Sequence, residues 1–151
     1  GEQRRVFRMV PGLAHAEFVR YGVIHRNTYL DAPRCLSPWL ELVGTRDVLI
    51  AGQLTGVEGY VESAAMGIWA GVVAARRIEG RTVAPPPRES AYGSLLAHLA
   101  DATPRDFAPM NINWGLFPER EPFPRDKAER RAAKLAAAAA SFDAWLQTEG
   151  I

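Results

Sequence analysis

An apolar run that breaks into glycines and then enters a small-residue segment is the feature that most constrains this chain. Val48–Ala51 is followed by Gly52, Gly56 and Gly59. Glycines at such a corner permit positive φ and let the backbone approach a ligand without an intervening Cβ. The unpaired amides at the start of a following helix, at its positive dipole end, can hold a phosphate, a carboxylate or a flavin carbonyl. The pattern predicts a strand, a Gly-rich corner and a ligand-facing helix N-terminus; a purely structural turn is the alternative.

The residues before the corner favour extended structure. Residues 17–30 are rich in aromatic and β-branched side chains without a helical period, which predicts one or two strands. Trp39–Val43 and Val48–Ala51 flank the turn-forming residues 44–47, so we expect a hairpin. Because Val48–Ala51 is wholly apolar, we expect it to become a central strand buried on both faces.

The residues after the corner follow a helical period. Small and apolar side chains recur every three or four residues from Gly59 to Ile78, over so wide a surface that we expect this helix to be buried on most sides. Gly67 and Gly71 each cost about 1 kcal/mol relative to alanine, so we expect them to permit close approach to a sheet. Gly80 is the expected C-terminal cap.

The rest of the chain alternates proline-rich and helical segments. Pro85–Pro87 is expected to form a stiff connector, and Ser90 to begin a helix over residues 91–100. Residues 101–124 are irregular and punctuated by proline, yet they carry many large apolar side chains, which predicts an ordered strap packed on the domain. Residues 127–147 are rich in alanine with one apolar stripe and are expected to form the last helix.

Three segments of the chain resemble one enzyme family. Phe18–Thr28, Gly52–Ala65 and Pro109–Pro118 are similar, in the right order, to the C-terminal part of the folate- and FAD-dependent tRNA uracil-5-methyltransferases (TrmFO). The resemblance covers residues from about Phe7 to Pro118. It implies an α/β chain that forms the C-terminal part of a glutathione-reductase-like FAD-binding fold. The implied order in this chain is a strand, a Gly-rich turn and a buried helix, followed by a Pro-rich aromatic strap and a C-terminal helix.

The same resemblance implies how the chain is divided. Residues 1–43 would be a strand-rich part of the substrate- or folate-side domain. Residues 44–122 would be the C-terminal part of the FAD-binding domain, and residues 123–151 the C-terminal helix.

The resemblance also implies cofactors and a substrate. FAD would lie at the corner, 5,10-methylenetetrahydrofolate would be the one-carbon donor, NAD(P)H the reductant, and C5 of a T-loop uridine of tRNA the acceptor. Gln53 stands where FAD enzymes of this fold commonly carry an aspartate that binds the ribityl chain. The residues implied to contact FAD are Gly52, Gln53, Thr55, Gly56, Val57, Glu58, Gly59 and Tyr60.

Two further residues are implied to bind folate. In the resembling family a histidine at the position of His25 stacks on the pteridine ring, and Asn27 could hydrogen-bond the ring edges. Taken without the resemblance, a lone histidine in an extended run is more often structural. Asn111 and Asn113 lie in the strap, which the resemblance brings near the active site, but neither receives a role.

Parts of that family's machinery are missing from the sequence. It contains no G-x-G-x-x-G loop, and its one cysteine, Cys35, stands where the family needs no thiol. We therefore expect a C-terminal segment of a larger enzyme, without catalytic residues and inactive alone, whose partners are the N-terminal part of the same enzyme and tRNA. Two alternatives remain open: a GidA-type flavoprotein that modifies wobble uridine, and a non-catalytic remnant of the fold that binds RNA or a protein.

Two clusters of charge each have a structural and a functional interpretation. Glu58 and Glu62, one helical turn apart, either stabilise the positive helix end or act as a general acid and base. A basic cluster at the start of the last helix is either a solvated face or a contact for tRNA phosphates. This cluster consists of Lys127, Arg130, Arg131 and Lys134.

Composition excludes several classes of protein. One cysteine rules out a disulfide framework, and three histidines without metal-ligand spacing predict no metal site. The longest uncharged run, residues 63–75, is shorter than the roughly 20 apolar residues of a membrane-spanning helix, and no signal peptide opens the sequence. We therefore expect a cytoplasmic protein. A net charge of +1 neither favours nor excludes nucleic acid.

Overall fold

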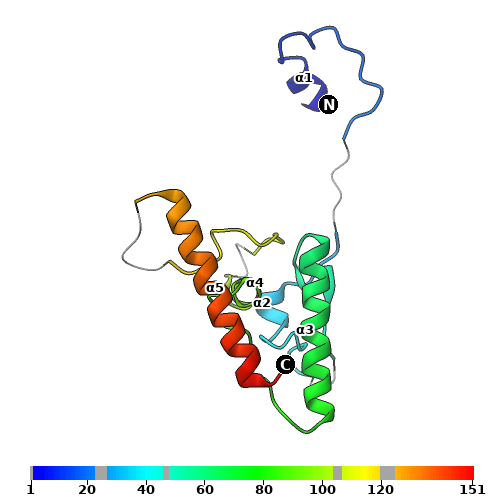
Figure 1. Ribbon diagram of the computed structural model, residues 1–151. Coiled ribbons are helices and arrows are strands. Elements are labelled where there is room, and N and C mark those ends of the chain that lie inside the picture. The colour runs from blue at the N-terminus through cyan, green and yellow to red at the C-terminus, as the bar shows by residue number, and fades with distance from the viewer. Residues whose placement is uncertain (1, 23–26, 46–47, 104–106, 120–124) are drawn as a thin grey trace.

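The computed structural model describes residues 2–22, 27–45, 48–103, 107–119 and 125–151. In these residues two long helices flank two shorter ones (Figure 1). The long helices are α3 and α5, and α2 and α4 lie between them. In chain order the helices are α1 (Glu2–Phe7), α2 (Ala32–Cys35), the 3-10 helix η1 (Gly52–Thr55), α3 (Tyr60–Ile78), α4 (Ala91–Asp101) and α5 (Lys127–Glu149).

The three longest helices confirm the predictions made from periodicity and capping. Helix α3 ends at a left-handed glycine, Gly80, with φ of 69°. Helix α4 begins at Ser90, whose hydroxyl accepts from the Gly93 amide at 3.0 Å. Helix α5 begins at Asp126, whose carboxylate accepts from the amides of residues 129 and 128; these bonds, that of residue 129 most, lower the pKa of the Asp126 carboxyl.

The predicted strands are not found in the described residues. Residues 17–22 and 27–30 are extended or bent without pairing into a sheet. The hairpin survives as isolated contacts, since the Leu42 amide donates to Val48 O at 3.0 Å and the Ile50 amide to Leu40 O at 2.8 Å. The prediction that Val48–Ala51 is buried on both faces is wrong here, because Val48 is 42% exposed. A central strand needs a partner on each side, and the described chain supplies one.

Helix α3 is buried on one face, whereas burial on most sides was predicted. Its buried side chains are Glu62, Met66, Trp69, Ala70 and Val73. Gly67 and Gly71 face open space, because a Cβ at either position would meet nothing within 4 Å. The prediction that these glycines permit close approach to a sheet is therefore wrong for this structure. A helix that is apolar all round has more than one face to bury, and its large side chains select the face found here.

Tryptophan side chains fix the loops around the core. The indole N–H groups of Trp39, Trp69 and Trp145 donate to backbone carbonyls of Val83 at 2.7 Å, Pro38 at 2.9 Å and Ala84 at 2.9 Å, respectively. The rings of Trp69 and Trp145 lie 6.0 Å apart and join α3 to α5. The buried core that they border contains Ala32, Leu36, Leu40, Val57, Met66, Trp69, Ala70, Val73, Val83, Leu95, Leu96 and Leu99.

Candidate functional site

The Gly-rich corner joins the hairpin to α3. Gly52, Gly56 and Gly59 have φ of 67°, 96° and 97°, so each adopts the positive φ for which the sequence pattern argued. Gly56 ends η1 in a left-handed conformation, and a Cβ there would lie 2.5 Å from the Phe107 ring. Gly59 precedes α3 with ψ of 151°, a combination that only glycine adopts readily. The corner therefore depends on glycine for its backbone path and for the packing of the strap.

The described part of the strap, residues 107–119, packs on this corner. Val57 forms a parallel bridge with Met110, and the Glu58 amide donates to Met110 O at 3.0 Å. In the reverse direction Asn111 Nδ2 donates to Glu58 O at 3.0 Å. This bond gives Asn111 a structural role that sequence reasoning did not assign, because the partners are 53 positions apart in the chain.

Glu62 ties α3 to the strap. Its side chain is 8% exposed, and Oε1 accepts from the Ile112 amide at 3.1 Å. A Cβ on Gly59 would overlap the Glu62 carboxylate, so the glycine leaves room for this side chain. Of the two interpretations offered by the sequence, this contact supports the structural one for Glu62. The side chain accepts a hydrogen bond from the strap, a role that stabilisation of the helix end did not include. Glu58, one turn earlier, is exposed.

Removing the Glu62 carboxylate is expected to release the strap. In Glu62→Ala the partly buried Ile112 amide loses its charged acceptor, which should lower the free energy of unfolding by about 1–3 kcal/mol. Amide hydrogen exchange over residues 107–113 should accelerate in the same variant. Glu62→Gln keeps a side-chain oxygen and is the matched control, with a smaller effect on both measurements. Equal strap exchange in the alanine variant and the unmodified protein would contradict this role.

The residues implied to contact FAD separate into two groups. Thr55, Gly56 and Val57 are buried, and the Thr55 hydroxyl donates to Gly52 O at 2.7 Å, so these residues shape the corner from within. The other group is accessible: Gln53, Glu58 and Tyr60 are exposed, and Gly52 and Gly59 are partly exposed. Within the described residues no side chain caps the first turn of α3. The outer surface of the corner is therefore a helix N-terminus with amides available to an acceptor.

The residues implied to bind folate are only partly described. His25 lies outside the described residues, and Asn27 is exposed. The segment that follows Asn27 reaches the corner, because the Leu30 amide donates to Leu54 O at 3.0 Å. Tyr29 meets Phe107 edge-on, with ring centroids 6.1 Å apart. Three separate stretches of chain thus meet beside the Gly-rich turn.

The basic cluster of α5 lines one pocket. Its volume is about 300 Å³, and it lies between the first half of α5 and the end of the strap. The structure brings all four predicted basic residues together there and adds strap residues that sequence reasoning missed, among them Trp114 and Glu119. No local sequence signal joined Trp114 to the basic cluster, because Trp114 lies 13 positions before Lys127 in the chain.

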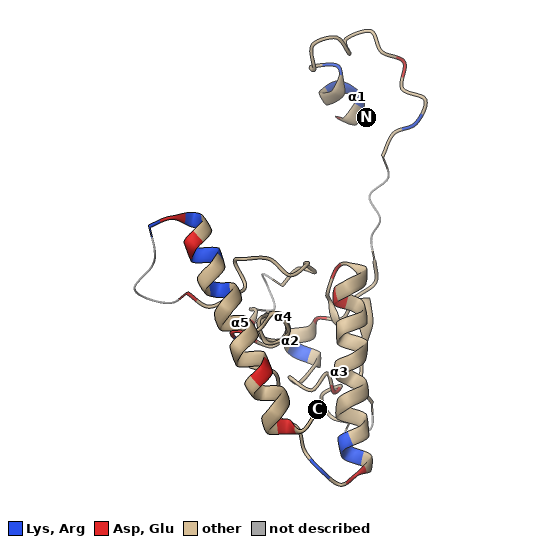
Figure 2. Ribbon diagram, viewed as in Figure 1, with Lys and Arg blue, Asp and Glu red and all other residues tan. Residues whose placement is uncertain are grey.

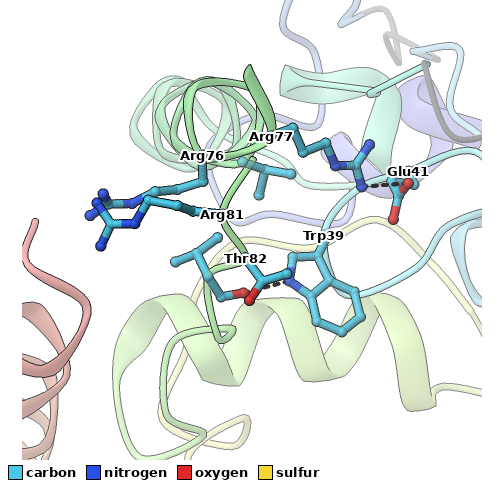
Figure 3. Close-up of a pocket in the computed structure, with 8 residues that line it drawn as sticks. Trp39, Glu41, Arg76, Arg77, Arg81 and Thr82 are labelled. Carbon is cyan, nitrogen blue, oxygen red and sulfur yellow. Dashed lines mark hydrogen bonds and ion pairs between the residues drawn. The ribbon is translucent and has the colours of Figure 1, made fainter. Parts of the chain in front are cut away.

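A second pocket lies at the C-terminal end of α3, and its arginines form contacts within the fold. It measures about 230 Å³ and is lined by Trp39 and three arginines (Figure 3). Arg77 forms an ion pair with Glu41, while Arg76 donates to the carbonyls of Glu149 and Gly150 at 2.6 and 2.9 Å. Figure 3 shows Arg76 pointing away from Trp39. Arg77 therefore joins α3 to the hairpin, and Arg76 joins it to the end of α5.

The described residues contain no group of three or more His, Cys, Asp and Glu side chains that could hold a metal ion. None of their helices is both long enough and apolar enough to cross a membrane.

Comparison with known proteins gives a consistent result. The sequence model of glucose inhibited division protein A matches residues 1–82. Over 146 residues, 97% of the chain, it is 49% identical to a Syntrophotalea carbinolica protein named methylenetetrahydrofolate–tRNA-(uracil-5-)-methyltransferase TrmFO, of which it covers 32%. TrmFO proteins of Desulforudis audaxviator and Geobacter sulfurreducens are 52% and 51% identical over 99% and 97% of the chain, which covers 34% of each.

The chain thus spans about a third of the length of the curated relatives it matches. The family match covers more than half of the chain and includes the Gly-rich corner and all of α3. The chain belongs to the glucose inhibited division protein A family.

Proposed function

We propose that the chain is part of an enzyme that transfers a one-carbon unit from 5,10-methylenetetrahydrofolate to C5 of a T-loop uridine in tRNA. The observation that carries the proposal is identity of 49–52% over 97–99% of the chain to proteins named methylenetetrahydrofolate–tRNA-(uracil-5-)-methyltransferase. FAD is the proposed cofactor and NAD(P)H the proposed reductant. A tRNA substrate makes the cytoplasm the proposed location.

The outer surface of the corner fits the ring end of a flavin. The first turn of α3 has no side-chain cap in the described part of the chain, and Tyr60 and Val61 are 96% and 79% exposed. The amides after Gly59 and the side-chain amide of Gln53 would hold FAD there. When bound, FAD supplies the redox chemistry of the reaction. The positive end of α3 would stabilise negative charge on the ring.

The remaining residues of the corner support this surface from behind. Thr55 and Val57 are fully buried, and the strap holds the backbone of Glu58 on both its amide and its carbonyl. A fixed backbone keeps the helix amides in one geometry, so a bound ligand does not have to order them. Asn27 and His25 are the proposed folate ligands. Contacts of Leu30 with the corner and of Tyr29 with Phe107 of the strap support an approach from that side.

An uncovered face of α3 supports a contact with the rest of a longer protein. Side chains every three or four residues along it are small or apolar, and Ile68 and Ile78 are 64% and 88% exposed. We propose that the part of the protein outside this chain, about two thirds of the relatives' length, covers this face. The face consists of Val61, Ala64, Ile68, Gly71, Ala75 and Ile78.

The two alternatives predict different products. A GidA-type enzyme would modify the wobble uridine, and a non-catalytic remnant would modify nothing. The names of the similar relatives specify methylation of tRNA at uracil C5, which favours the proposed reaction over both alternatives.

A labelled donor separates these functions. A protein of the relatives' length that contains this chain, supplied with isotope-labelled methylenetetrahydrofolate, NAD(P)H and unmodified tRNA, is expected to place the label in 5-methyluridine. Mass spectrometry of the digested nucleosides measures the product, and a tRNA without the T-loop uridine is the control substrate. A labelled wobble nucleoside would support the sister reaction. Absence of label, despite bound and reducible flavin, would overturn the proposed function.

A further inference from the structure

The pocket between α5 and the strap combines positive charge with an aromatic surface. Of the seven described residues that line it, four are basic and one is acidic. Trp114 is 37% exposed, and Arg131 lies over its ring with Cζ 5.6 Å from the centroid. The indole and the guanidinium together form a platform of the kind on which a nucleobase stacks. The lining residues are Trp114, Gly115, Glu119, Lys127, Arg130, Arg131 and Lys134.

The charge along α5 runs against the helix dipole. The four bases of the pocket lie in the first half of the helix, whereas the second half carries Asp143 and Glu149 and no lysine or arginine (Figure 2). Cations near a helix N-terminus and anions near a C-terminus are each unfavourable, by about 0.3–1 kcal/mol. Asp126 and Glu129 offset only part of this at the first turn. Helix stability therefore does not explain these lysines and arginines. A bound anion, however, would be stabilised both by their side chains and by the N-terminal end of the helix.

The four bases do not share one role. Lys134 is 15% exposed, and its Nζ donates to Glu119 Oε1 at 2.9 Å and to Trp114 O at 3.4 Å. These bonds hold the strap against α5 and so set the shape of the pocket. Lys127, Arg130 and Arg131 are exposed, and none of them lies within ion-pair distance of an acidic side chain among the described residues. These three are available to a ligand.

We infer that this pocket binds the substrate tRNA, taking phosphates on Lys127 and Arg130 and an unpaired base or ribose on the Trp114–Arg131 platform. The inference rests on the proposed function for the identity of the RNA. The lysines and arginines of the pocket extend over about two turns of helix, roughly 10 Å at 1.5 Å per residue. That length meets more than one phosphate of a polynucleotide, whereas a small anion needs only one cation pair. The aromatic platform adds a contact that phosphate alone would not use.

The test measures tRNA affinity against salt in the flavin-loaded full-length protein. Lys127→Gln and Arg130→Gln are each expected to weaken binding three- to tenfold, and to reduce the slope of log affinity against log salt by about 0.7–0.9 per lost phosphate contact. Trp114→Leu should weaken binding with the slope unchanged, because it removes stacking and not charge. Arg81→Gln is the matched control, because it removes an exposed arginine that lies just beyond the C-terminal end of α3.

The outcomes separate this inference from the proposed function. In steady-state methylation the pocket variants should raise KM for tRNA, with kcat, folate KM and flavin content unchanged. If affinity and slope match those of Arg81→Gln, the pocket does not bind RNA, whatever the enzyme's product. If the variants raise folate KM instead, the pocket binds the acidic tail of folate and the inference is overturned. Weakened tRNA binding in a protein that forms no 5-methyluridine would support the pocket and overturn the proposed function.

Discussion

Gly93→Ala is expected to destabilise the chain by several kcal/mol. A Cβ at Gly93 would lie 2.5 Å from Pro86 O and closer still to the carbonyl of Pro87. Both obstacles are backbone, and the proline rings restrict the φ angles by which that backbone could move away. Overpacking typically costs about 1–3 kcal/mol and more where neither side can shift. The midpoint of denaturant unfolding measures the loss.

Gly71→Ala is the matched control for that substitution. It also adds one methyl group within a helix, but nothing lies within 4 Å of the new atom. In this chain it should raise stability by up to about 1 kcal/mol through helix propensity. In a longer protein whose remainder covers the exposed face of α3, the same substitution should lose that gain or destabilise. Equal losses for Gly93→Ala and Gly71→Ala in this chain would contradict the packing described for α4.

Gly59→Ala should abolish most flavin binding in the full-length protein. With φ of 97° and ψ of 151°, Gly59 occupies a region that costs other residues about 1–3 kcal/mol. The new Cβ would also displace the Glu62 carboxylate and Asn111 Nδ2, which hold α3 and the strap together. We therefore expect the first turn of α3 to shift and its amides to leave their positions. The visible absorbance of bound flavin, per mole of purified protein, measures the effect.

A second glycine with positive φ controls for backbone strain alone. Gly44 has φ of 88° in the hairpin turn, and a Cβ there would meet nothing within 4 Å. Gly44→Ala should cost a comparable strain energy but leave the flavin content of the protein unchanged. If Gly59→Ala retains as much flavin as Gly44→Ala, the start of α3 does not contact the cofactor.

Helices α3, α4 and α5 were predictable because their signals are local. Ser90 and Asp126 are capping residues one position before α4 and α5, and Gly80 follows α3, so the sequence alone located these ends to within two residues. Periodicity could not decide which face of α3 is buried. Met66, Trp69 and Val73 compete there with Ile68 and Ile78, and the neighbours that settle the matter lie elsewhere in the chain.

The candidate site was predictable only in its glycines. Their spacing after an apolar run indicated the corner, and Gly52, Gly56 and Gly59 all have the expected positive φ. The strap contacts join residues about 50 positions apart, such as Glu62 with Ile112, and no local pattern encodes them. The strand before the corner was overpredicted because apolar content signals burial but does not supply a pairing partner.

The indole hydrogen bonds have a consequence for the order in which the chain folds. They join residues 31, 44 and 61 positions apart, from Trp69 to Pro38, from Trp39 to Val83 and from Trp145 to Ala84. Helices need only neighbouring residues and form early, but contacts of such separation require large loops to close first. The loops before η1 and after α3 should therefore order late and together, in the same kinetic step that docks α5.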